Sequence, residues 1–211
     1  MDKVVNILVK RLREWYSYYL PEFSRTIQSH EKFVELILKK SKNELLKEIR
    51  VRKEDSMGAD LSNDDLKPMM ALAEHMVSLY ILKERQKTYL ESVMRKYCPN
   101  MLAVAGPLIG AKLIEHAGSI RRLTQFPAST VQLLGAEKAL FRHIKTGSRS
   151  PKYGLIYNHQ LIAQAKKRDQ GKVARGLADK ISIAVKIDHF KGEFIGNKLK
   201  KELEKKFIIR Q

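Results

Sequence analysis

Apolar residues recur at every third or fourth position over most of the chain, which is the period of an amphipathic α-helix. The first such pattern covers residues 2–20 and stops before Pro21, because proline disfavours a helical conformation in the preceding residue. Two longer patterns follow, over about residues 24–51 and 63–97. Shorter helical stripes fill much of the remainder, so we predict an all-α protein.

The two longer patterns are joined by a short turn, which is typical of an antiparallel coiled-coil hairpin. We predict an N-terminal helical segment (residues 1–30), an antiparallel coiled-coil arm (31–98) and a globular helical domain (99–211). A plain helical bundle is the alternative to the coiled coil. The last helix of the arm is rich in methionine, which suggests an exposed seam that also serves self-association. The residues predicted to hold such a dimer are Met69, Met76 and Tyr80.

One stretch of the globular domain, residues 134–144 (LGAEKALFRHI), combines several signals of a binding helix. Gly135 suits a sharp entry into a helix, and Glu137 in the first turn favours the helix dipole. Lys138 and Arg142 are four residues apart and therefore share one face. We predict a cationic front, free backbone N–H groups at the start that suit phosphate, and a buried back. The residues predicted for the buried back are Leu140, Phe141 and Ile144.

Basic residues continue beyond this stretch. The loop of residues 145–154 (KTGSRSPKYG) is predicted to complete an RNA-contacting edge, with a plain solvated loop as the alternative. Lys172 and Arg175 lie at the start of a helix that begins near Gly171, where cations oppose the helix dipole, so anion binding explains them better than stability. The residues of this helix predicted to face inward are Val173, Leu177, Ile181, Ala184 and Val185. The full set of residues predicted for this anion-binding surface is Gly135, Ala136, Glu137, Lys138, Arg142, Lys145, Arg149, Lys152, Lys172 and Arg175, and His143 joins it because it lies within the string GAEKALFRHI, whose resemblance to a known family is given below.

The charge of the chain supports a polyanionic partner. The net charge is +18, and residues 99–211 carry 22 Lys and Arg against 8 Asp and Glu, whereas residues 1–98 carry 19 against 15. Such an excess in one half points to nucleic acid or to an anionic membrane surface. The basic half has no tryptophan and no long amphipathic basic helix, which disfavours the membrane. No apolar run is long enough for a transmembrane helix.

Catalytic and metal-binding patterns are missing from the sequence. The six histidines lack the spacing of a helical zinc motif, and the single cysteine, Cys98, reads as a small buried residue in a reducing compartment. There is no phosphate loop, and nothing marks a nucleophile. We therefore predict no enzyme activity, no metal site and no cofactor, with an RNA-modifying or RNA-cleaving enzyme as the alternative.

Several strings along the chain resemble one family. They are LREWY (12–16), GAEKALFRHI (135–144), RSPKYG (149–154), GKVAR (171–175) and GEFI (192–195), the last followed by a lysine-rich helix. Together they resemble the Nop domain and its preceding coiled coil, found in the scaffold proteins of box C/D guide RNPs and in a spliceosomal relative. The likeness covers most of the chain, and its central string is specific.

The resemblance implies a non-catalytic RNP scaffold. The globular domain would bind a guide RNA with a kink-turn together with its kink-turn-binding protein, and the arm would self-associate into a homodimer. The particle supports RNA 2′-O-methylation, such as rRNA modification, by the partner methyltransferase fibrillarin. Relatives carry an N-terminal fibrillarin-binding domain, whereas this chain begins at the coiled-coil region, so fibrillarin docking is not carried over.

The absence of a lysine-rich tail favours an archaeal protein, in the archaeal cytoplasm, over a nucleolar or nuclear eukaryotic one. The rival within the family is the spliceosomal Nop-domain protein. The length of the partner RNA would discriminate between the two.

Overall fold

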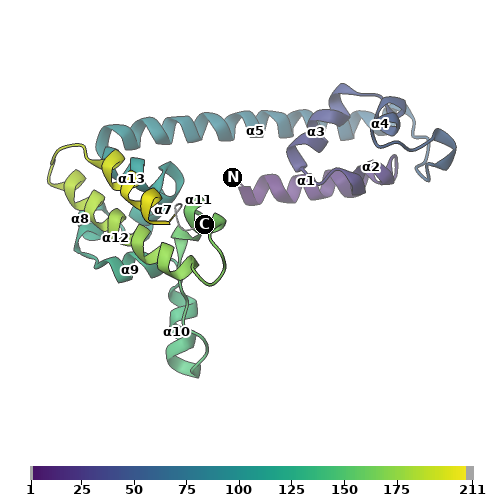
Figure 1. Cartoon of the computed structure of the whole chain (residues 1–211). Helices are drawn as coiled ribbons and strands as arrows, with labels where there is room; N and C mark the ends of the chain where they lie inside the picture. The colour runs from purple at the N-terminus through teal and green to yellow at the C-terminus, as the bar shows by residue number, and fades with distance from the viewer. Residues whose placement is uncertain (1, 208–211) are drawn as a thin grey trace. The chain divides into compact units, whose positions relative to one another are not determined.

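A computed structural model describes residues 2–207 (Figure 1). Every regular element among these residues is a helix, which confirms the all-α class. The chain divides into an N-terminal unit (residues 1–86) and a C-terminal unit (87–211), each with its own hydrophobic core. The division falls inside α5, before the boundary predicted at residue 98. None of the described helices has the length and hydropathy that a membrane crossing needs.

The N-terminal unit contains four short helices, one turn of 3-10 helix and the first part of a long helix. They are α1 (Asp2–Tyr16), α2 (Pro21–Thr26), α3 (His30–Lys39), α4 (Lys42–Glu48), η1 (Lys53–Asp55) and α5 (Asn63–Tyr97). The prediction of one continuous helix over residues 24–51 is wrong. The Ser29 hydroxyl accepts a bond from the Lys32 N–H at 3.4 Å, and Ser41 forms a capping box with Glu44. Each serine starts a new helix, because its side chain satisfies backbone groups that a continuing helix would use.

The antiparallel pairing in this unit is made by α1 and α5. Asp2 at the start of α1 pairs with Lys83, far along α5, at 2.8 Å, as antiparallel helices require (Figure 1). Residues 1–30 therefore share one core with the rest of the unit. That core is formed by Val5, Val9, Leu12, Tyr16, Leu20, Phe23, Phe33, Val34, Leu36, Ile37, Leu45, Leu46, Met69, Ala73 and Met76.

Two of the three residues predicted to hold a dimer are methionines that are buried in this core. Met69 and Met76 are fully buried in this core, and Tyr80 is partly buried against it. Their spacing on α5 predicted a common face, but the short helices of the same chain already cover that face. The expectation of an exposed seam at these three residues is therefore wrong.

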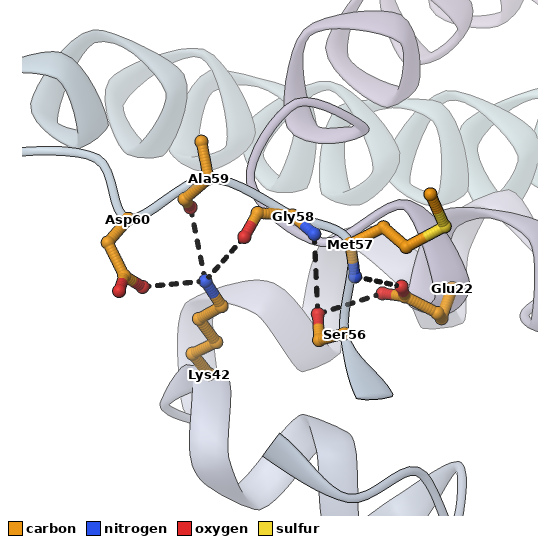
Figure 2. A network of polar contacts seen from close by, with 7 residues as sticks. All are labelled: Glu22, Lys42, Ser56, Met57, Gly58, Ala59 and Asp60. Carbon is orange, nitrogen blue, oxygen red and sulfur yellow. Dashed lines mark hydrogen bonds and ion pairs between the residues drawn. The ribbon is translucent and has the colours of Figure 1, made fainter. Parts of the chain in front are cut away.

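Polar contacts anchor the loop that leads back to α5 (Figure 2). The Lys42 ammonium donates to the Ala59 carbonyl at 3.1 Å and to the Asp60 carboxylate at 2.9 Å. The Glu22 carboxylate accepts from the Met57 N–H at 2.8 Å and from the hydroxyl of Ser56 at 3.1 Å. These contacts hold the loop in one conformation.

The C-terminal unit begins in the last part of α5 and is built around a central helix, α12 (Gln170–His189). The others are α6 (Pro99–Ala105), α7 (Pro107–Ala117), α8 (Ile120–Gln125), α9 (Ala128–Leu133), α10 (Glu137–Thr146), η2 (Leu155–Asn158), α11 (Gln160–Gln164) and α13 (Gly196–Phe207). Helices α6, α8, α9 and α13 pack on α12, whose apolar residues are buried among them. Cys98 is buried, as predicted, and this burial raises the pKa of its thiol to about 11.

A buried polar contact fastens three elements of this unit together. The Asp188 carboxylate of α12 accepts from the N–H of Asn100 at 3.0 Å and of Met101 at 2.8 Å, and so caps the start of α6. The Asn100 side chain, almost fully buried, accepts from the Ile195 N–H at 2.7 Å just before α13. A negative charge at a helix N-terminus is favourable, and all these polar groups are satisfied.

Candidate nucleic-acid interface

Helix α10 projects from the rest of the C-terminal unit (Figure 1) and has no buried residue. Phe141 is 67% exposed and Ile144 is 73% exposed, while Leu140 is half-buried. The predicted buried back of this helix is therefore wrong. No other described helix covers α10, so its apolar face meets solvent.

A narrow neck holds α10 in this position. The chain leaves the unit at Leu134 and returns at Gly154, where the Gly154 N–H donates to the Gln132 carbonyl and the Leu155 N–H to the Leu134 carbonyl, both at 2.8 Å. A Cβ at Gly154 would lie 2.1 Å from the Leu134 oxygen, so only glycine allows the two segments of the neck to approach this closely. Gly135 has φ +86°, and a Cβ there would lie 2.5 Å from Leu155. The two glycines are therefore structural parts of the neck.

The start of α10 carries a carboxylate where a phosphate site was predicted. The Glu137 carboxylate accepts from the Gly135 N–H at 2.6 Å, and the Ala136 N–H donates to the Leu133 carbonyl at 2.8 Å. The bond from Gly135 holds the pKa of Glu137 below its usual value. A carboxylate at this helix end would repel a phosphate, so Gly135, Ala136 and Glu137 shape the helix start.

Hydrogen bonds within the chain also terminate α10 at its C-terminal end. Gly147 adopts the left-handed conformation with φ +68°, and its N–H donates to the His143 carbonyl at 2.9 Å. The His143 ring Nδ1 is hydrogen-bonded to the Ser148 carbonyl oxygen. The His143 side chain is therefore engaged in turning the chain out of the helix.

Four of the predicted basic residues are exposed on α10 and the loop after it: Lys138, Arg142, Lys145 and Arg149. None of them forms an ion pair within residues 2–207. Helical spacing places the first three on one side, next to Phe141 and Ile144. We call the group Lys138, Phe141, Arg142, Ile144 and Lys145 the α10 surface. It combines cations that suit phosphate with an apolar patch that suits a protein.

A second basic group lies where the loop meets α12. The Tyr153 hydroxyl donates to Gln170 at 2.8 Å, and its ring stacks on the exposed ring of Tyr157 with centroids 4.9 Å apart. This contact sets Lys152 over Gly171, whose Cβ position would be 3.6 Å from the Lys152 side chain. Lys152 is thereby brought to the first turn of α12, which also carries Lys172.

The two predicted cations of α12 differ in their surroundings. Lys172 faces the Asp169 carboxylate at 3.5 Å, which compensates its unfavourable position at the helix start. Arg175, one turn further, is exposed and has no ion-pair partner among the described residues. Of the two, Lys172 is therefore already charge-compensated, whereas Arg175 is not, among residues 2–207.

Sequence reasoning missed the exposed apolar residues of this region: Phe141, Ile144 and Tyr157. The signal of Phe141 and Ile144 was present as an amphipathic pattern, but the pattern was assigned to the core. Among the described residues there is also no cluster of His, Cys, Asp or Glu that suits a metal ion.

Comparisons with known proteins agree with this architecture. A family model described as "Nop: snoRNA binding domain, fibrillarin" matches residues 1–208. A NOP5 family protein of Methanocaldococcus jannaschii is 39% identical over 220 residues, covering 98% of this chain and 53% of the relative. Nucleolar protein 58 of Aspergillus clavatus is 40% identical over 202 residues, covering 89% of this chain and 34% of the relative.

A solved structure gives the same result for the fold. A chain in the crystal structure of a fibrillarin/Nop5p complex has a TM-score of 0.53 and 30% sequence identity, and the match covers 100% of this chain and 69% of that chain. The chain spans about half, or less, of the length of the two curated relatives above. The family match nevertheless runs through both compact units, so the chain belongs to the Nop family.

Proposed function

We propose that this chain is a non-catalytic scaffold of a box C/D-type guide RNP, which supports RNA 2′-O-methylation by a partner methyltransferase. Its C-terminal unit binds a kink-turn RNA together with the kink-turn-binding protein. The observation that carries the proposal is the α10 surface, where exposed apolar side chains lie on a projecting helix beside cations that form no ion pair in the described part of the chain.

The cations of the C-terminal unit are suited to RNA. Residues 87–211 contain 25 Lys and Arg against 9 Asp and Glu, while residues 1–86 contain 16 against 14. Phosphate contacts made by such residues release counterions and supply most of the sequence-independent affinity for nucleic acid. Arg142 and Arg149 can in addition make paired hydrogen bonds to a phosphate or to a guanine edge.

The apolar residues of α10 point to a second, protein component of the same site. RNA phosphates and sugars cannot bury Phe141 and Ile144 favourably. A protein surface that covers them gains roughly 1.5–3 kcal/mol for each fully buried side chain. A composite surface of RNA and its bound protein therefore satisfies both halves of the α10 surface.

A gel shift tests this composite recognition. We expect the chain to bind the complex of kink-turn RNA and its binding protein more tightly than the RNA alone. Phe141→Ala should weaken binding to the complex and leave the weaker binding to bare RNA nearly unchanged, whereas Arg142→Ala should weaken both. Equal affinity for the complex and for bare RNA would contradict the proposal that α10 contacts the protein.

We place self-association on α1, in place of the buried methionines. An exposed apolar stripe follows one face of α1 and the turn after it, formed by Val4, Ile7, Trp15 and Tyr18. The spacings of three and eight residues keep these side chains on one side of a helix. Arg11, paired with Glu14 at 2.8 Å, lies between Ile7 and Trp15 on this face. Exposed apolar side chains grouped on one face mark interaction sites, and the same face of a second copy is the partner we propose.

Sedimentation equilibrium of the full chain tests this assignment. We expect a dimer that Ile7→Glu dissociates, because it buries an unpaired charge in the interface. The matched control is Asn6→Glu, which adds the same charge at an exposed position off the stripe. A monomeric unmodified chain, or equal dissociation by both variants, would refute the assignment.

Fibrillarin is the methyltransferase that we propose for the assembled particle, because a structural relative occurs in a complex with it. A guide-RNP scaffold of this kind works in the cytoplasm of an archaeal cell or in the nucleolus of a eukaryotic one, and a nucleolar protein is among the relatives.

A further inference from the structure

A groove runs along α6, α7 and α13 of the C-terminal unit and is lined by none of the α10 residues. It consists of two hollows of about 830 Å³ and about 600 Å³. The hollows share four lining residues, Leu102, Ala103, Pro107 and Lys200, and are therefore adjoining parts of one depression. Two adjoining hollows accommodate a chain segment that runs from one into the other better than a compact small molecule.

The wall of the larger hollow is aliphatic. Leu102, Leu108, Ile109 and Leu161 line it, and Leu108 is 51% exposed although it is apolar. In the second hollow the exposed ring of Phe194 continues the apolar surface. Apolar surface of this kind favours a ligand that removes it from water.

The floor of the groove is already rigid. The His159 ring Nε2 lies 3.1 Å from the Val104 carbonyl oxygen, to which it donates, and Nδ1 accepts from the Leu161 N–H at 3.3 Å. Both ring nitrogens are thus used within the protein, and the ring must be neutral to make both bonds. His159 supports the groove and has no nitrogen left for a ligand.

Positive charge borders the groove. Lys112 and Lys200 line the larger hollow, and neither forms an ion pair among residues 2–207. In the second hollow Arg95 is already paired with Glu91 at 2.8 Å. Glu204 is the acidic residue of the larger hollow, so cations outnumber it there. A ligand with carboxylates beside apolar side chains would match both the charge and the wall.

We propose that this groove binds an acidic segment of a partner protein, with its apolar side chains on the aliphatic wall and its carboxylates at Lys112 and Lys200. Single-stranded RNA fits less well, because base recognition uses aromatic stacking and most of the wall is aliphatic. The groove uses none of the residues of the α10 surface, so this proposal is independent of kink-turn binding.

Nuclear magnetic resonance of the isotope-labelled full chain tests the proposal. Three probes are compared: a short peptide of leucine and glutamate, the same peptide with lysine in place of glutamate, and a short oligouridylate. We expect the acidic peptide to shift the amide signals of Leu108, Ile109 and Leu161 in a saturable way, and the basic peptide to leave them unchanged. No saturable shift by the acidic peptide, or a stronger shift of these signals by the oligouridylate, would overturn the proposal.

Charge reversal makes the test specific. Lys112→Glu and Lys200→Glu should each weaken binding of the acidic peptide about threefold, the scale of one exposed ion pair. Leu108→Asn should weaken it by a similar factor, and all three variants should still bind the kink-turn complex. The matched control is Lys186→Glu at an exposed site outside the groove. If the control weakens the peptide as much as Lys112→Glu does, the attraction is to net charge and the groove proposal fails.

Discussion

Helices α10 and α12 belong to the same unit and carry similar patterns, yet they use their apolar faces differently. In α12 the predicted inward-facing residues Val173, Leu177, Ile181, Ala184 and Val185 are all buried, which confirms the prediction for that helix. In α10 the equivalent predicted face is exposed at Phe141 and Ile144. The difference lies in the neighbours, because α6, α8, α9 and α13 surround α12 whereas α10 stands on a glycine neck. An amphipathic pattern thus shows that a helix has an apolar face, but not which chain covers it.

The largest expected effect separates the two helices by stability. Leu177→Ala should lower the free energy of unfolding by about 2–5 kcal/mol, because it leaves a cavity in the core. Phe141→Ala should change it by less than about 0.5 kcal/mol, as expected for an exposed position. Thermal and denaturant unfolding followed by circular dichroism would measure both. A large loss in Phe141→Ala would show that α10 is covered within its own chain.

For binding affinity, in contrast to stability, we expect the larger effect from substitutions on α10. Arg142→Ala should lose about 1–3 kcal/mol of affinity for the kink-turn complex, while its melting temperature stays unchanged. Arg142→Lys should recover only part of the loss, because lysine cannot make paired hydrogen bonds. Affinities would come from gel shifts at one stated salt concentration. Binding equal to that of the unmodified chain would show that the cationic side of α10 is only solvated.

The neck can be tested with two glycine substitutions. Gly154→Ala should cost about 1–3 kcal/mol, because its Cβ would overlap the Leu134 carbonyl oxygen and force the neck apart. Gly147→Ala also strains a left-handed residue, but a Cβ there meets nothing within 4 Å, so we expect about 1 kcal/mol. Hydrogen exchange of the backbone amide of Leu155, which bonds across the neck, would report the opening. Equal exchange in both variants would show that the neck does not hold α10.

The smallest expected effect is the pH dependence of stability that His159 causes in the C-terminal unit. Burial, with Lys200 nearby, lowers the pKa of His159 despite its bond to the Val104 carbonyl. The unfolded chain therefore binds a proton at about pH 6.5 that the folded chain resists, so stability falls as the pH drops below that value. We expect a loss on the order of 1 kcal/mol per pH unit just below it.

His159→Gln is the variant that isolates this contribution. It removes the titrating group, so the slope of unfolding free energy against pH between about pH 6.5 and 5 should be shallower than in the unmodified chain. The slope is the readout, because the substitution also alters the cap of α11. An unchanged slope would show that His159 does not titrate differently in the folded state.

Periodicity determined much of this protein without any structure. The helical class, the apolar face of α12 and the cationic character of the second half all followed from spacing, propensity and charge, which are properties of short segments. The glycine that precedes α10 and the basic residues of this helix were predicted in the same way. Each of these features depends on neighbours only a few residues away.

Tertiary structure alone decided which apolar faces remain free. Met69 and Met76 look like a seam on α5 but are covered by α1 to α4, while Phe141 looks like core but projects on the neck. The serine caps at Ser29 and Ser41 broke an apparently continuous helix, because a local side-chain bond outweighed the periodic pattern. Burial depends on packing between segments far apart in the chain, and a pattern along one segment carries no information about what packs against it.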